Sequence, residues 1–253
     1  MIDCHCHLEQ KEFDGIREQV IKKCKEKLKA IVTCCAHPKD FDLTVNLVEK
    51  HKGFLFCTAG IHPEFVKELS NEEIENFMKK IEENKDQLVG IGEVGLDFHH
   101  VKEKAWQEKQ EELFVRFIRL AKKLNKPLVV HSRDAYEKAL AILEREGMKN
   151  KSVLLHLFGN KNLIERVVSN GWYVSIGPGI VKSKTTKKIA RDMPLENILL
   201  ETDSPWFGFG SVGTPLNVEI ACEKIAEIKK ISKEAVSEQT DKNAIKFFSL
   251  RCS

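Results

Sequence analysis

Long apolar runs, linker-like tracts and a strong excess of one charge are all missing from this 253-residue sequence. No apolar stretch is long enough to span a bilayer and no apolar targeting segment precedes Asp3, so we expect a cytoplasmic protein with no membrane partner. The net charge of +3 is too small to predict nucleic-acid binding from composition. Without repeats or Pro/Gly/Ser linkers, the chain is expected to form one domain over residues 1–253, with no obligate protein partner.

Cysteine is not scarce, but the sequence does not predict a disulfide framework. The eight cysteines belong to a chain expected in a reducing compartment. Cys24 and Cys34 fall in patterns typical of a helix core and a strand core, where a free thiol behaves as a small apolar group. We therefore expect reduced thiols.

Short apolar runs alternate with amphipathic segments of helical length. The first helix is expected near residues 15–29, with Ile16, Val20, Cys24 and Leu28 on its buried face, and a capping box from Ser70 to Glu73 begins the third. Eight such units in about 250 residues predict a single-domain α/β protein, a (β/α)₈ TIM barrel. An open doubly wound sheet would need a glycine-rich phosphate turn after the first strand, and none is present. The expected strands are residues 1–6, 30–35, 54–59, 88–92, 127–130, 152–155, 172–176 and 198–200.

The first expected strand carries the clearest chemical signal. His5 and His7 are two residues apart, so a regular strand places both imidazoles on one face, where they can bind one divalent metal ion. Cys4 and Cys6 would then point to the opposite face. The chain has no second cysteine pair that would complete a thiolate site, which favours the histidines as ligands.

Active sites of such barrels lie at the C-terminal ends of the strands. A single histidine or aspartate there is more often a capping or loop residue than a ligand, but this many at matching positions favour a metal site. Metal-competent side chains at the expected strand ends are His5, His7, His62, Glu93, His131, His156 and Asp203.

Six of these residues are too many for one tetrahedral catalytic zinc ion, and they suit two metal ions about 4 Å apart. We assign His5, His7 and Asp203 to the first ion and His131 and His156 to the second, with Glu93 bridging both. Water between the ions would lose a proton near neutral pH and become the nucleophile, with Asp203 as its proton acceptor. Mg²⁺, Mn²⁺ and Zn²⁺ all remain candidates.

Six short motifs follow one another along nearly the whole chain, at residues 3–8, 60–63, 91–97, 130–135, 156–158 and 200–205. This ordered set resembles the TatD family of metal-dependent deoxyribonucleases, within the amidohydrolase-type TIM barrels. The resemblance implies hydrolysis of DNA phosphodiester bonds from the 3′ end, with the ligands assigned above. It also implies phosphate contacts for His62 and Arg133, and a catalytic role for His62 beside Glu93 and Asp203.

Two departures from the family pattern bear on the substrate. Leu157 stands where the family usually has cysteine, and the loop 206–215 lacks the Arg-Asn pair that relatives commonly carry before the proline. Trp206, Phe207 and Phe209 in this loop would either stack on bases or close the barrel mouth, and both interpretations stay open. The lysines at positions 182, 184, 187 and 188 are interpreted as a solvated helix face.

Two alternative functions remain from sequence. The same two-metal site would hydrolyse an ester or amide, in a small molecule or an aminoacyl-tRNA, and RNA or tRNA is the alternative nucleic-acid substrate. A non-catalytic metal- or nucleic-acid-binding barrel is disfavoured because Glu93, Asp203 and the histidines are all retained.

Overall fold

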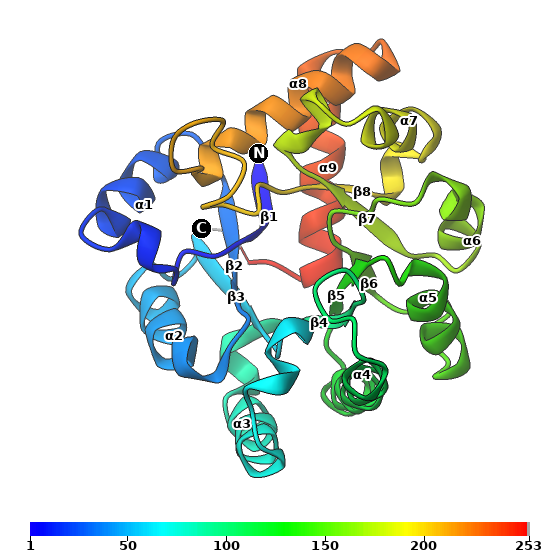
Figure 1. The fold of residues 1–253 in the computed structure, drawn as a ribbon. Coiled ribbons are helices and arrows are strands. Elements are labelled where there is room, and N and C mark those ends of the chain that lie inside the picture. The colour runs from blue at the N-terminus through cyan, green and yellow to red at the C-terminus, as the bar shows by residue number, and fades with distance from the viewer. Residues whose placement is uncertain (252–253) are drawn as a thin grey trace.

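Residues 1–251 are described in the computed structural model, and its eight parallel strands form one sheet in the order of the sequence. Figure 1 shows the strands as a ring with the helices outside it, which confirms the predicted (β/α)₈ barrel over an open doubly wound sheet. The strands are β1 Ile2–Cys6, β2 Ala30–Cys35, β3 Leu55–Ala59, β4 Leu88–Asp97, β5 Leu128–Arg133, β6 Val153–Leu155, β7 Tyr173–Ile176 and β8 Ile198–Leu200.

The helices between the strands bury apolar stripes against the outside of the sheet. Helix α3 begins with the predicted capping box, in which Ser70 and Glu73 satisfy each other's backbone N–H groups. None of the described helices is long and apolar enough to cross a membrane. The helices are α1 Arg17–Lys25, α2 Phe41–Lys50, α3 Asn71–Glu83, α4 Lys104–Leu124, α5 Tyr136–Arg145, α6 Ile164–Ser169, α7 Lys184–Asp192, α8 Val218–Lys229 and α9 Lys233–Phe248.

Backbone hydrogen bonds between β1 and the segment after β8 close the ring. The Asp203 N–H donates to the His5 carbonyl at 2.9 Å, and the His7 N–H donates to the Ser204 carbonyl at 2.8 Å. Closure therefore places Asp203 beside both histidines of β1. The ligands assigned to the first ion come from the two ends of the chain for this reason.

Helix α9 covers the N-terminal end of the barrel. Its Asp241 carboxylate pairs with the Met1 amino group, and its Asn243 side chain donates to the Ile198 carbonyl at the start of β8. Phe247 and Phe248 belong to the same apolar cluster as Ile2, Val129 and other side chains of the lumen. Because α9 closes the N-terminal end of the barrel, the end that stays open is the one formed by the C-terminal ends of the strands.

Two expectations about β1 and α1 are wrong. Cys4 lies with Ile2 in the lumenal apolar cluster, whereas Cys6 packs with the outer core. Between Asp3 and Cys6 the pairing of β1 with β2 shifts register, so strict alternation fails there. Ile16 is 40% exposed because α1 starts one residue later and turns Ile21 inward instead.

Strand β4 is longer than predicted and carries a second irregularity. It continues past residue 92 to Asp97, and its pairing with β5 shifts register between Ile91 and Val94. A Cβ atom at Gly95 would lie 2.0 Å from the His131 carbonyl oxygen, so glycine permits the close approach of these strands. Glu93 therefore projects from a bulge inside the strand, not from its end. Likewise β5 extends to Arg133 and contains His131.

Candidate metal centre

The six side chains assigned as ligands from sequence meet in a cleft of about 650 Å³ at the C-terminal ends of the strands. Five of these residues line the cleft directly, and His5 lies beneath them with only 1% of its surface exposed. His62 and Arg133, the residues expected to contact phosphate, line the same cleft. The structure thus brings every sequence-predicted site residue to one place, while their roles remain predictions.

The first group of ligand atoms comes from β1 and the segment after β8. The Nε2 atoms of His5 and His7 lie 3.7 and 3.5 Å from the same Asp203 oxygen, Oδ1. The same two nitrogens lie 3.4 and 3.6 Å from Glu93 Oε2. We call His5, His7 and Asp203 the first set.

The second group surrounds the other oxygen of Glu93. His131 Nδ1 and His156 Nε2 each lie 2.9 Å from Glu93 Oε1, and these two nitrogens are 3.4 Å apart. We call His131 and His156 the second set. Each oxygen of the Glu93 carboxylate therefore faces a different set of imidazoles, which is the geometry of a bridging ligand.

An unsatisfied atom shows that the first set fits a cation. His5 Nε2 is buried and has no hydrogen-bond partner, although two carboxylate oxygens lie within 3.7 Å. A buried polar atom left unpaired costs about 1–3 kcal/mol, and a divalent ion between this nitrogen and the carboxylates would remove that cost. Imidazole nitrogen and carboxylate oxygen are the donors that Zn²⁺ and Mn²⁺ accept together.

Three buried carboxylates stand behind the imidazoles, and sequence reasoning gave them no role. Glu9 lies 3.1 Å from His7 Nδ1, Asp97 lies 3.0 Å from His131 Nε2, and Glu201 lies 3.4 Å from His156 Nδ1. Such partners fix the orientation of a metal-binding imidazole and raise its basicity. The signal in the sequence was proximity, since Glu9 and Glu201 are each two residues from a predicted ligand.

The carboxylates around the site raise the proton affinity of the imidazoles. Burial lowers the pKa of His7 and of His156, but the surrounding carboxylates together outweigh it, with Glu9 first at His7 and Glu93 first at His156, so both pKa values lie well above the usual range. Burial raises the pKa of Glu93, but the surrounding histidines, with His156 first, together bring it well below its usual range. In the absence of metal, protons bound to the imidazoles therefore compensate the negative charge of the surrounding carboxylates, a role that metal ions would take over.

His62 differs from the other imidazoles in its protonation. Burial and the neighbouring His131 lower its pKa to about 3, so the ring is neutral. Its Nδ1 accepts the backbone N–H of Glu64 at 3.3 Å, which leaves the proton on Nε2, 3.5 Å from Glu93 Oε1. His62 therefore presents a hydrogen-bond donor to the cleft.

The Arg133 guanidinium is available to a ligand of the cleft. The two acidic residues nearest to it along the chain and across the strand pair have other partners, since Asp134 pairs with His99 and Asp97 pairs with His131. Within residues 1–251 no ion pair of Arg133 is present, and its side chain is exposed at the cleft. Its planar fork of donors suits phosphate oxygens.

We expect metal ions to stabilise the protein more strongly as the pH rises. The folded-state pKa values of His7 and His156 are raised, so their protons stabilise the metal-free fold at low pH, and this stabilisation is lost as the pH increases through those values. The same protons compete with metal. At saturating Mn²⁺ or Zn²⁺ the melting temperature should rise by about 5–10 °C, with the larger increase at pH 8 than at pH 6.

Thermal denaturation of chelator-treated protein, with and without each metal, measures this increase. His51→Gln is the matched control, because His51 pairs with Glu18 outside the cleft and should leave the pH dependence intact. An increase of the same size at both pH values would contradict the proton competition.

Comparison with known proteins extends over nearly the whole chain. The family described as TatD related DNase matches residues 2–249. A mouse protein named putative deoxyribonuclease TATDN3 is 38% identical, over 98% of this chain and 88% of its own. An uncharacterised metal-dependent hydrolase of Methanocaldococcus jannaschii is 32% identical, over 99% of this chain and 97% of its own. The crystal structure of YjjV, a TatD homologue from Escherichia coli, has the same fold, with a TM-score of 0.89 at 23% identity over 98% of each chain.

Proposed function

The chain belongs to the TatD family of metal-dependent hydrolases, and on that premise we propose that it cleaves phosphodiester bonds of DNA with two divalent metal ions. In this proposal His5, His7 and Asp203 hold one ion, the second set holds the other, and Glu93 bridges them. Cleavage proceeds from the 3′ end, as the family resemblance implies.

One observation carries the two-metal proposal. The two oxygens of Glu93 face different imidazole sets, with Oε2 3.4 Å from His5 Nε2 and Oε1 2.9 Å from His156 Nε2. A carboxylate that served one ion, or none, would have no need of nitrogen ligands at both oxygens. Two such ions, when bound, polarise the phosphate and make the attacking water more acidic.

The residues of the chain supply positioning and proton transfer. Asp203 is ionised, because burial raises its pKa but the hydrogen bond with His7 and the charge of His156 lower it more, so its carboxylate can accept the proton of the attacking water. The His62 Nε2–H donates to a phosphate oxygen, and Arg133, which lines the same cleft, meets the phosphate of the bound strand.

End-labelled single-stranded DNA tests the proposal. Metal-free protein is incubated with a 5′-labelled and a 3′-labelled strand while Mg²⁺, Mn²⁺ or Zn²⁺ is added in turn. We expect metal-dependent shortening: the 5′-labelled strand gives a ladder, and the 3′-labelled strand releases its label as a mononucleotide first.

Two variants purified identically separate this activity from a contaminating nuclease. Glu93→Ala should abolish the shortening, and Glu68→Gln, an exposed carboxylate outside both sets, should retain it. If two ions bind per chain and no DNA is cleaved with any metal, the DNA assignment is wrong. Ester substrates and aminoacyl-tRNA would then be tested with the same site.

A further inference from the structure

The loop 206–213 carries a concentration of exposed aromatic side chains. Trp206, Phe207 and Phe209 are 50%, 38% and 43% exposed, and no other tryptophan, tyrosine or phenylalanine among residues 1–251 is so exposed. Three neighbouring rings in water are costly unless a ligand covers them. We call these three residues the aromatic platform.

The loop that carries the platform has a defined backbone. Its N–H at Gly213 donates to the Pro205 carbonyl at 2.8 Å, and a Cβ atom at Gly208 would lie only 1.8 Å from the Ser211 carbonyl oxygen. Phe207 and Phe209 both adopt the left-handed region, with φ of 55° and 52°, which bulky residues rarely occupy. The fold thus holds these rings outward at a conformational cost, a pattern typical of ligand-binding loops.

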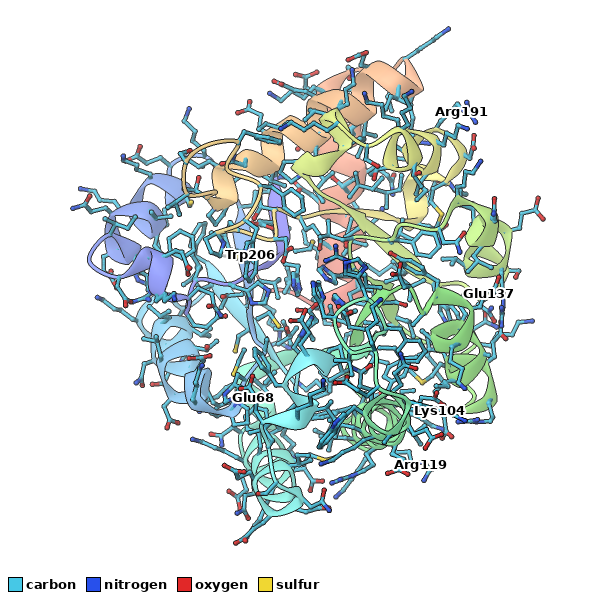
Figure 2. The ribbon with its side chains drawn as sticks, in the orientation of Figure 1. Glu68, Lys104, Arg119, Glu137, Arg191 and Trp206 are labelled. Carbon is cyan, nitrogen blue, oxygen red and sulfur yellow. The ribbon has the colours of Figure 1, made fainter. Side chains whose placement is uncertain are left out.

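The platform continues directly from the candidate metal centre. The Trp206 ring lies edge-on to the His7 ring with centroids 5.0 Å apart, and Trp206 and Phe207 line the cleft that holds both sets. In Figure 2, Trp206 lies toward the centre of the ring of strands, whereas Lys104, Glu137 and Arg191 lie on the helices outside that ring. A ligand bound at the metal ions could therefore also contact the platform within the same cleft.

A second hollow of about 560 Å³ shares Trp206 and Phe207 with the cleft and extends to α7. Phe207 rests on Gly179, where an added Cβ atom would lie 3.2 Å from the ring, so the glycine lets the ring pack on the loop after β7. The Lys182 ammonium lies 5.1 Å from the centroid of the Phe209 ring. The hollow therefore combines ring faces with a positive charge.

Building on the proposed phosphodiester hydrolysis, we propose that the aromatic platform stacks an unpaired base of the strand whose phosphodiester lies at the metal ions. Flat rings beside a lysine match a nucleotide, since a base offers a π-face and its phosphate pairs with the ammonium of Lys182. Bases in a duplex are already stacked and paired, so the platform favours single-stranded ends. Stacking of this kind does not discriminate strongly between bases.

Phe209 is the residue to test, because its described contact is with Lys182 and with none of the metal-site residues. Binding is measured by fluorescence anisotropy with a hydrolysis-resistant phosphorothioate decathymidylate and with a strand of the same length made of abasic residues. Phe209→Ala should weaken binding of the first strand about 10-fold and binding of the abasic strand less than about twofold. Phe209→Trp should restore binding of the first strand.

Two further measurements guard against misfolding and non-specific effects. Ile231→Ala removes an equally exposed apolar side chain, 40% exposed between α8 and α9, and should leave the binding of both strands unchanged. Fluorescence of the unaltered protein should fall on binding the strand with bases and not on binding the abasic strand. Of the three tryptophans Trp206 alone is exposed, whereas Trp172 is fully buried and Trp106 is half-buried on α4, outside the cleft.

The outcomes separate the platform from the hydrolysis on which it rests. Base-dependent binding without any cleavage would retain the platform and overturn the nuclease proposal. Cleavage with equal affinity for both strands, or equal weakening of both by Phe209→Ala, would overturn the platform and leave the nuclease proposal standing.

Discussion

Replacing Glu93 with glutamine is expected to lower kcat/KM by about 10³-fold or more, which corresponds to roughly 4 kcal/mol of transition-state stabilisation. The glutamine side chain has the same size, but only one of its two end atoms can bind a metal. Its NH₂ group would face either the nitrogens of the first set or those of the second, where an oxygen now lies 3.4 or 2.9 Å away. One ion would lose a ligand and the bridge would be broken.

Metal content distinguishes the loss of a bridge from general damage. Mass spectrometry of native protein should show two ions per chain in the unaltered protein and one or none in Glu93→Gln. Without metal, the variant should also show lower pKa values at His131 and His156, because both imidazoles lose the carboxylate that favours their charged form. NMR titration of the histidine ring protons measures that change.

The control for this variant is Glu68→Gln, whose carboxylate is exposed and lies 3.9 Å from His37, outside both sets. It should keep both ions and at least half of the activity. Retention of two ions and full activity by Glu93→Gln would contradict the bridging role.

The barrel and the residues of its cleft could be predicted from the sequence because both follow from regular features of secondary structure. Apolar periodicity separates strands from helices, and parallel strands gather their C-terminal ends at one rim. His156 directly follows β6, and Asp203 comes three residues after the end of β8. Their positions in the sequence relative to these strands were therefore enough to place both in the cleft. No knowledge of side-chain packing was needed for this step.

Prediction failed where a strand is irregular. Alternation assumes one residue opposite one residue, and β1 and β4 each contain a register shift next to His5 and Glu93. The glycines at 92 and 95 were the available signal for β4, because their φ values of 136° and 147° suit glycine alone. In β1 the sequence shows no such signal, and Cys4 was placed on the wrong face.

The carboxylates behind the imidazoles were missed for a different reason. Their role depends on the second nitrogen of each ring, and the direction of that nitrogen follows from side-chain packing. Asp97 is the last residue of β4 and meets His131 on β5. Its pKa lies well below the usual range because hydrogen bonds from His131 and His100 together outweigh burial. Only the register between the two strands reveals that contact.

The second large effect is expected at Asp203. Asparagine is the appropriate replacement, because Asp203 has φ of 54° and asparagine tolerates this left-handed conformation better than alanine. Asp203→Asn removes the carboxylate that faces His5 and His7 and that, in the proposed function, accepts the proton of the attacking water. We expect kcat to fall about 10²- to 10³-fold while KM changes less than about threefold, since the substitution leaves the proposed phosphate contacts of His62 and Arg133 in place.

Which of the two sets loses its metal ion tests the assignment of Asp203 to the first set. Asp203→Asn should weaken metal binding at the first set and leave metal bound at the second set, whereas Glu93→Gln should weaken metal binding at both sets. The control is Asp192→Asn on α7, an exposed aspartate paired with Arg191 that should change neither kcat nor metal content. Because Asp203 is ionised well below neutral pH, the unaltered protein should keep its activity down to mildly acidic pH and lose it as protons displace metal from the imidazoles.

If Asp203→Asn instead raised KM and left kcat unchanged, Asp203 would be a substrate contact and the proton acceptor would have to be sought among the other carboxylates of the cleft.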